Sequence, residues 1–394
     1  MLGLGAMGSS AAAHLAARGQ RVLGLEQFTP VHDRGSSHGE TRLIRQAYFE
    51  DPAYVPLLLR SYELWEDLEL EHPGTLTITG GLMIGAAESI VVSGSIRSAE
   101  EWSLPFEVLD TSELRRRFLV LAPSEGTIAL YERRAGFVRA EQTVRAHIER
   151  AAVRGAELHF REKVQSWRAS GSGVEVRTAD DAYAADRLVI APGAWASQLL
   201  PEFASNLTVE RQLLFWFQPT GGIELYRPPQ FPVFVWEDET GMQIYGFPAY
   251  GRDEDGVKIA FFRNGVPTDP EHLDRQIHPD EIARITSYVA QRMPTLPGRF
   301  LRGAACMYTT TPDEHFVLTI HPQHPEVVIA AGFSGHGFKF VPVMGEIICD
   351  LVLDGATRHP ISLFDANRLP TNSINGGVLG HPHFDRRLPR GPRT

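Results

Sequence analysis

The chain begins with a glycine-rich turn, Gly3-Leu4-Gly5-Ala6-Met7-Gly8, followed by an alanine-rich segment that predicts a helix over 9–18. Glycines at this spacing let a helix N-terminus approach a pyrophosphate, because they carry no Cβ. A predicted strand over 20–25 ends at Glu26, 18 residues after the last glycine. An acid at that distance can accept hydrogen bonds from ribose hydroxyls. The sequence therefore predicts a dinucleotide site that uses Gly3, Gly5, Gly8 and Glu26.

The first strand of this unit is expected to be short. Only Met1 and Leu2 precede the first glycine, whereas strands usually have about five residues. A misassigned start codon is one explanation. By itself the N-terminal motif fits an NAD(P)-dependent β-hydroxyacid dehydrogenase about as well as an FAD-binding protein. The short strand also leaves open a nucleotide-binding protein without turnover.

A second glycine-rich segment, Gly332-Phe333-Ser334-Gly335-His336-Gly337-Phe338-Lys339, lies about 330 residues later. Its glycines let the backbone come close to a flat ligand. Two such segments at opposite ends of the chain favour one long cofactor that is held at both ends. FAD fits this description better than NAD, because the second segment has no place in a hydroxyacid dehydrogenase.

Composition excludes several classes of protein. The net charge of −10 argues against nucleic acid as a partner. No apolar run approaches the ~18 residues of a membrane span, and no signal peptide is evident. The two cysteines provide no disulfide framework. We therefore expect a soluble, cytoplasmic protein without a metal site or a membrane partner.

The order of predicted elements indicates a mixed α/β (α+β) fold with a Rossmann-like domain. One strand is predicted over 77–84 and one of parallel type over 327–331, and 157–160, 164–169 and 174–178 are expected to form a meander. At 394 residues the chain is long enough for two domains. From 206 to 302 the predicted strands are antiparallel, and they include a hairpin around 251–256.

We therefore predict a discontinuous FAD-binding domain with an inserted antiparallel-sheet substrate domain. The cofactor domain is assigned to 1–80, 137–205 and 303–369, and the substrate domain to 81–136 and 206–302. Residues 370–394, rich in Gly, Pro, Asn, His and Arg, are expected to form a flexible tail.

Longer segments carry a more specific signal. They are Gly35-Ser36-Ser37-His38-Gly39-Glu40-Thr41-Arg42-Leu43-Ile44-Arg45, Ala305-Cys306-Met307-Tyr308-Thr309, Pro312-Asp313-Glu314 and the second glycine-rich segment. From Leu2 to about Asn367 the chain resembles the amine oxidase family of the monomeric sarcosine oxidases and N-methyltryptophan oxidases. The resemblance implies a monomer that oxidises N-methyl amino acids with O2, giving the primary amino acid, formaldehyde and H2O2. An N-methyl-L-tryptophan oxidase, or another secondary-amine oxidase, is the alternative.

The resemblance also implies FAD linked covalently to Cys306 through its 8α-methyl group. Taken alone, a lone cysteine is more often a buried core residue, and we interpret Cys349 in that way. A thiolate is the attacking species in such a linkage, so a nearby cation is expected to lower its pKa. Resemblance and the close-approach turn at 192–195 add further flavin-binding residues: Ser37, His38, Arg42, Gly193, Trp195, Gly335 and Gly337.

Two cations are assigned by resemblance to the substrate carboxylate, Arg45 and Lys339. The guanidinium of arginine suits a carboxylate because its planar fork donates two parallel hydrogen bonds. Arg42 and Arg45 lie three residues apart and would share one face of a helix or a tight turn. A solvated surface pair is the ordinary alternative.

Other site residues follow from the resemblance. Lys258 is assigned to the flavin N5, where its charge would stabilise superoxide; the alternative is an outward-facing lysine on a strand. Tyr245, Tyr308 and His336 are assigned to the pocket, and Tyr245 is equally a half-buried strand aromatic. Met242 and Phe262 are assigned to the substrate pocket. The family carries a histidine in place of Phe262, so we expect a bulkier or more apolar substrate than sarcosine unless this ring only fills the core.

Overall fold

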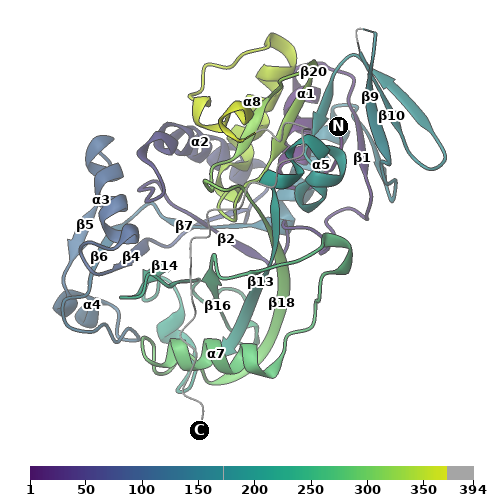
Figure 1. Ribbon diagram of the computed structural model, residues 1–394. Helices are drawn as coiled ribbons and strands as arrows, with labels where there is room; N and C mark the ends of the chain where they lie inside the picture. Colours follow the sequence, from purple (N-terminus) through teal and green to yellow (C-terminus); the bar gives the residue numbers. More distant parts are fainter. Residues whose placement is uncertain (172, 371–394) are drawn as a thin grey trace.

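The structure is a computed structural model that describes residues 1–171 and 173–370 (Figure 1). Apart from Pro370, the tail predicted over 370–394 lies outside the described residues. The chain forms two connected parts, one built around a parallel sheet with helices and one around a large mixed sheet. Within the described part of the chain, no helix is both long and apolar enough to cross a membrane.

The parallel sheet is assembled from distant parts of the chain around Leu2. Leu2 forms parallel bridges to Leu25 on one side and to Ile190 on the other. The first strand is therefore reduced to one bridging residue, as its shortness in the sequence predicts. The paired strands are β1 (Leu23–Glu26) with β8 (Glu157–Phe160), β12 (Leu188–Ile190) in parallel with β20 (His324–Ala331), and β19 (Val317–His321) antiparallel to β20.

Helices cover this sheet, and their small residues allow close packing. In α1 (Ala6–Ala17), the alanine and serine side chains other than that of Ala17 are buried. A Cβ on Gly345 of α8 (Val341–Asp354) would lie 2.2 Å from the Ser10 Oγ, so the two helices can approach only with glycine there. The other helices on this side are α2 (Val55–Glu71) and α5 (Ala140–Val153), beside a short α6 (Ala196–Leu199).

Two strand predictions are wrong. β8 does not join the meander, because it pairs in parallel with β1; the meander consists of β9 (Ser166–Ser170), β10 (Gly173–Arg177) and β11 (Ala182–Ala185). The strand expected over 77–84 is two strands in different sheets, β3 (Leu76–Ile78) and β4 (Gly81–Gly85). The backbone turns between them at Gly80, which has φ +74°.

The second part is a nine-stranded sheet that includes the predicted hairpin of β15 (Gln243–Gly246) and β16 (Val257–Phe262). The sheet is mixed, because β4 runs parallel to β14 (Val233–Glu237). Helix α7 (Pro279–Ala290) packs on it, and α3 (Ile90–Glu101) and α4 (Thr111–Arg117) lie near its other end. Its remaining strands are β17 (Val266–Pro267), β13 (Thr208–Gln218), β6 (Ile128–Glu132), β5 (Glu107–Leu109) and β18 (Arg299–Thr310).

Two features connect the parts. A three-stranded sheet is formed by β2 (Thr41–Ile44), β7 (Gly136–Arg139) and β3. The long strand β18 pairs with β13 over its whole length, so the boundary placed at residue 303 falls inside a strand of the large sheet. Cys306 lies on β18 and packs against Leu214, Trp216 and Ala260 of the large sheet.

Candidate active site

A cavity of about 420 Å³ lies where the parallel sheet meets β18. Both glycine-rich segments line it, although they are some 330 residues apart in the sequence. Its volume is within the range of ligand sites. The predicted residues on its wall are Gly3, Gly5, Glu26, Ser37, Arg42, Gly193, Trp195, Tyr308, Gly335 and Gly337. In the described residues, no group of three or more His, Cys, Asp or Glu side chains is placed to hold a metal ion.

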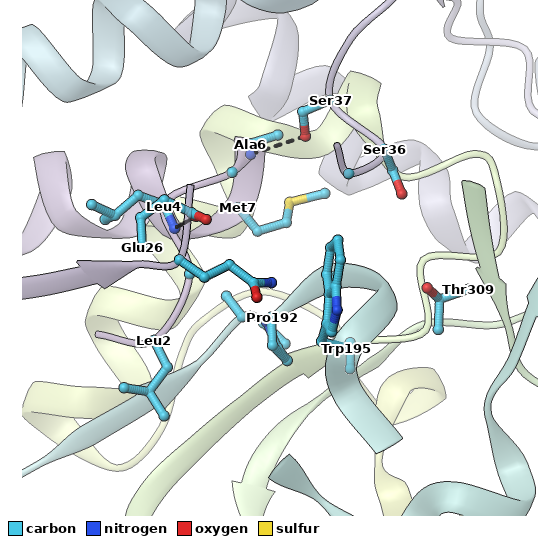
Figure 2. A pocket seen from close by; sticks show the side chains of 18 of the residues that line it. Leu2, Leu4, Ala6, Met7, Glu26, Ser36, Ser37, Pro192, Trp195 and Thr309 are labelled. Carbon is cyan, nitrogen blue, oxygen red and sulfur yellow. Dashed lines mark hydrogen bonds between the residues drawn. The ribbon is translucent and has the colours of Figure 1, made fainter. Parts of the chain in front are cut away.

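The N-terminal glycines serve two different purposes. Gly3 has φ +85°, and a Cβ on Gly8 would lie 1.9 Å from the Gly3 carbonyl oxygen, so both are required by the turn itself. A Cβ on Gly5 would meet only the Ser37 Oγ, at 3.6 Å. Gly5 therefore leaves the N-terminus of α1 open toward the cavity. Figure 2 shows this end of the helix, where the Ala6 amide donates to the Ser37 Oγ at 3.2 Å.

Glu26 ends β1 and forms part of the same wall. Its carboxylate accepts from the amides of Leu4 at 2.9 Å and Phe28 at 3.1 Å. Burial disfavours ionisation, but the His32 side chain and these amides outweigh it and hold the pKa of Glu26 below its usual value. The carboxylate is thus fixed as an anionic acceptor beside the glycine turn (Figure 2).

Trp195 and Met7 both line the cavity (Figure 2). The Trp195 indole is edge-on to the Phe28 ring at 5.3 Å, and its Nε1 donates to Glu271 at 3.0 Å. The ring is therefore held rigidly, and it gives the cavity an apolar side.

Cys306 and Cys349 differ in their electrostatic surroundings. The Sγ of Cys306 lies 3.8 Å from the Arg42 Nη2 and 3.6 Å from the Ser36 carbonyl oxygen. Burial opposes the thiolate, but His38 and Arg42 outweigh it and lower the pKa of Cys306 to about 7. Burial raises the pKa of Cys349 to about 11. The reactive form is thus accessible near neutral pH only at Cys306 of the two.

Arg42 and Arg45 do not share a face, because the segment that carries them is neither a helix nor a tight turn. Arg42 is on β2, and Arg45 directly follows this strand, so an odd spacing directs them to opposite sides. Arg42 lines the cavity and donates to the Ser36 and His38 carbonyl oxygens. Neither is a solvated surface arginine: Arg45 is only 2% exposed.

Arg45 lies in a buried ionic cluster beyond the cavity. Its Nη2 is 2.6 Å from the Glu50 Oε2, and its Nη1 donates to the Ala47 carbonyl oxygen at 2.8 Å. Burial opposes the charge of Glu50, but Arg45 and Arg263 outweigh it and lower the pKa of Glu50 to about 2. Burial, with the Arg45 charge, lowers the pKa of Lys339 to about 7.

His336 belongs to the second glycine-rich segment and lies beside this ionic cluster. Its Nε2 is 2.9 Å from the Glu314 carbonyl oxygen, and its Nδ1 is 2.5 Å from the Tyr48 hydroxyl. Since a carbonyl can only accept, Nε2 carries the proton and Nδ1 accepts from Tyr48. Burial lowers the pKa of His336 well below its usual value, so the ring is neutral. The Lys339 Nζ donates to the His336 carbonyl oxygen at 2.8 Å.

Aromatic side chains join the ionic cluster to the cavity. The Phe262 ring lies 6.2 Å from that of Tyr245, 6.5 Å from that of Tyr308 and 6.5 Å from that of Phe49. Tyr308 also lines the cavity, so these rings form a continuous wall. Met242 is not brought into this group: it lies in the β14–β15 turn, where its amide donates to Asp238.

Gly335 and Gly337 are expected to be glycines so that the backbone can approach a flat ligand, and the structure shows an additional reason. A Cβ on Gly335 would lie 2.3 Å from the Tyr308 ring, and one on Gly337 would lie 2.7 Å from the Phe333 side chain. Aromatic neighbours, in addition to any flat ligand, therefore require glycine at both positions.

Lys258 is an inward-facing lysine, since it is only 2% exposed. Its ammonium donates to the carbonyl oxygens of Gly39 at 2.6 Å and Thr41 at 2.8 Å, and lies 3.3 Å from the Thr41 hydroxyl. Burial, with the Arg42 charge, lowers the pKa of Lys258 well below its usual value. The outward-facing alternative is therefore wrong.

Sequence reasoning missed four members of the site: Tyr48, Phe49, Glu50 and Arg263. Arg45 stacks on the rings of Tyr48 and Phe49, with its guanidinium carbon 4.3 and 4.0 Å from their centroids. Their only sequence signal is the proximity of 48–50 to the arginine pair. Arg263 has the weaker signal of directly following Phe262.

Comparisons with known proteins agree with this arrangement. Residues 2–351 match the family described as FAD dependent oxidoreductase. The monomeric sarcosine oxidase of Streptomyces avermitilis is 54% identical over 371 residues, which cover 94% of this chain and 97% of the relative. The N-methyl-L-tryptophan oxidase of Salmonella heidelberg is 32% identical, with 93% and 98% covered.

Solved structures show the same fold. The open form of NikD, an unusual amino acid oxidase essential for nikkomycin biosynthesis, superposes with a TM-score of 0.80 at 24% identity, covering 92% of this chain and 95% of that one. Glycine oxidase from Geobacillus kaustophilus gives a TM-score of 0.76 at 22% identity, with 95% and 98% covered. The prediction of a Rossmann-like FAD domain combined with a sheet domain is confirmed.

Proposed function

The chain belongs to the family of FAD dependent oxidoreductases, and we propose that it is an oxidase of N-methyl amino acids of the sarcosine type. The products are the primary amino acid, formaldehyde and H2O2. The observation that carries this proposal is the buried cluster of Arg45, Glu50 and Lys339, which adjoins the cofactor cavity through one aromatic wall. The family match overturns the NAD(P)-dependent hydroxyacid dehydrogenase alternative.

The residues present fit an FAD molecule. The open N-terminus of α1 at Gly5 suits the pyrophosphate, and the carboxylate of Glu26 suits a ribose. When bound, the flavin supplies the two-electron chemistry between the amine and O2. The low pKa of Cys306 beside Arg42 supports covalent attachment at that sulfur.

Arg45 and Lys339 are proposed to bind the substrate carboxylate. These two cations face one carboxylate, Glu50, so this group has one uncompensated positive charge. A substrate carboxylate supplies the missing negative charge. Two buried cations also disfavour the ammonium form of the substrate, so the amine is held in the neutral form that can be oxidised. Neutral His336 and the hydroxyls of Tyr245 and Tyr308 complete the polar surface.

Lys258 is proposed to act in the reaction with O2. Its ammonium is fixed by the carbonyl oxygens of Gly39 and Thr41, and Thr41 begins the strand that also carries Arg42. A cation held in this way favours the negative charge that develops on reduced oxygen. The same charge is expected to contribute less to amine oxidation than to the reaction with O2.

Substrate size is proposed to depend on Phe262. An apolar ring beside Tyr245 and Tyr308 favours N-methyl amino acids with a larger or more apolar side chain than that of sarcosine. An N-methyl-L-tryptophan oxidase is the second candidate, supported by a relative of that name at 32% identity. The name of the relative at 54% identity supports a monomer.

The test is oxidation by the purified holoenzyme of sarcosine, N-methylalanine and N-methyl-L-tryptophan, with the parent primary amino acids as controls. Formaldehyde and H2O2 should appear in equal amounts with the N-methyl substrates only. Turnover of primary amino acids without formaldehyde would contradict the proposal and indicate an amino acid oxidase.

A further inference from the structure

Arg263 lies beside the ionic cluster, and its guanidinium group is incompletely paired although the side chain is only 20% exposed. Its Nη1 is 2.8 Å from the Glu314 Oε2. Its Nε and Nη2 are buried and have no hydrogen-bond partner among the residues that the structure describes. The Glu50 Oε1 is also buried and has no hydrogen-bond partner among the described residues. It lies 3.8 Å from the Arg263 Nη2. Two complementary groups thus face each other just beyond hydrogen-bond distance.

Such an arrangement is costly, because buried charged groups normally find hydrogen-bond partners. The backbone adds to the cost: Arg263 has φ +54° and Glu314 has φ +61°, a region that non-glycine residues seldom adopt. The Phe262 ring lies 4.6 Å from the Arg263 guanidinium carbon and fixes it in place. Strain and missing hydrogen bonds at one point indicate a group held ready for a second partner.

Glu50 itself is shared between two guanidinium groups but bonded to only one. Its Oε2 is 2.6 Å from the Arg45 Nη2. Arg45 also donates to the Ala47 carbonyl oxygen through Nη1, so a substrate carboxylate that approaches Nη2 competes with Glu50 for the same edge of the guanidinium. Without another cation, a displaced Glu50 would be a buried and unpaired anion, which is strongly unfavourable.

Resting on the proposed function, we propose that Arg263 is a positioning residue that receives Glu50 when a substrate carboxylate binds Arg45. A shift of less than 1 Å closes the 3.8 Å separation to hydrogen-bond length. The charges then balance: Arg45, Lys339 and Arg263 face Glu50, Glu314 and the substrate carboxylate. Arg263 thereby determines how tightly a carboxylate is bound, without touching it.

The test compares Arg263→Met with Arg284→Met as a matched control. Arg284 is exposed and lies outside the site. Like Arg263, it stacks on an aromatic residue of β16: its guanidinium carbon is 4.8 Å from the centroid of the Phe261 ring. Each holoenzyme is titrated with (methylthio)acetate, which has a carboxylate and no oxidisable amine, and the flavin absorbance change gives Kd. Arg263→Met should raise Kd by about tenfold or more, and Arg284→Met should leave it unchanged.

Repeating the Arg263 substitution in a Glu50→Gln protein distinguishes a positioning role from a general loss of structure. If Arg263 acts by receiving Glu50, its removal should have little effect on Kd in a Glu50→Gln protein, and Arg263→Lys should restore part of the affinity. Substrate KM should rise with Arg263→Met while kcat changes less. Equal Kd values for Arg263→Met and Arg284→Met, or the same loss in the Glu50→Gln background, would overturn the inference. If Arg263→Met does not fold, Arg263→Gln replaces it in the same comparison.

Failure of the proposed function has a different signature. In that case the wild-type holoenzyme itself would show no absorbance change with (methylthio)acetate and no H2O2 with N-methyl amino acids. The inference about Arg263 fails when the wild type binds (methylthio)acetate and oxidises N-methyl amino acids, but the effect of Arg263→Met on Kd does not depend on Glu50.

Discussion

The Sγ of Cys306 on β18 lies 3.8 Å from the Nη2 of Arg42 on β2, although 264 residues separate them in the chain. The contact joins the large sheet to the cofactor cavity and places a cation beside a thiol. Together with His38, Arg42 lowers the pKa of Cys306 to about 7. The nucleophilic thiolate is therefore more accessible at neutral pH than it is for an ordinary cysteine.

The first prediction concerns covalent attachment of FAD. With Cys306→Ala, acid precipitation should release all flavin into the supernatant, because no thiolate remains beside Arg42. With Cys349→Ala, a cysteine whose pKa is raised to about 11, the pellet should stay yellow. Absorbance of pellet and supernatant measures both. Yellow pellets from the Cys306 variant would contradict the assignment.

Carboxylate binding should weaken above neutral pH. The pKa of Lys339 is lowered to about 7, so its ammonium is lost as pH rises through this value, and with it part of the attraction for a carboxylate. We expect Kd for (methylthio)acetate to rise between pH 7 and 9. Lys339→Met should bind more weakly at pH 6 and lose most of this dependence. The same pH slope in both proteins would exclude Lys339 as its source.

Lys339 should have the opposite effect on the stability of the substrate-free protein: its contribution to the free energy of unfolding should increase as pH rises. The Lys339 pKa is lower in the folded protein than in the unfolded chain, where it is about 10.4. Between these values the unfolded chain binds more protons, so this group makes folding more favourable as pH rises from about 7 to about 10. Denaturant unfolding at pH 7 and 9 should show a gain in wild type that is smaller in Lys339→Met. An equal gain in stability in wild type and Lys339→Met would contradict this prediction.

Lys258→Met should slow the reaction of the reduced enzyme with O2 much more than the reduction by substrate. A fixed cation that stabilises a developing anion contributes roughly 100-fold or more to such a step. Stopped-flow measurements of the two half-reactions separate the effects. Similar slowing of both would point to a structural role for the hydrogen bonds to Gly39 and Thr41.

Phe262→His should shift substrate preference toward sarcosine. The phenyl ring contributes apolar contact of roughly 1–3 kcal/mol to a larger N-methyl substrate, and an imidazole contributes less. The measurement is kcat/KM for sarcosine, N-methylalanine and N-methyl-L-tryptophan with both proteins. If sarcosine is preferred by a similar margin in each, Phe262 only fills space among Tyr245, Tyr308 and Phe49.

Much of the cofactor half could be predicted because its signals are local. The glycine turn, α1 and the acid that ends β1 are governed by backbone conformation and helix propensity over fewer than thirty residues. The β15–β16 hairpin also follows from a polar turn between neighbouring strands. Family resemblance extended this to the assignment of the chain as an FAD dependent oxidoreductase.

Tertiary packing decided the remainder. The pairing of β8 with β1 and the division of 77–84 between two sheets depend on which distant strand is available, and residue periodicity carries no such information. The opposite orientation of Arg42 and Arg45 follows from strand pairing in β2. Arg263 meets Glu50 only because β16 ends beside the segment that follows β2. Electrostatic coupling between buried groups depends on distance and desolvation, and both are properties of the folded chain.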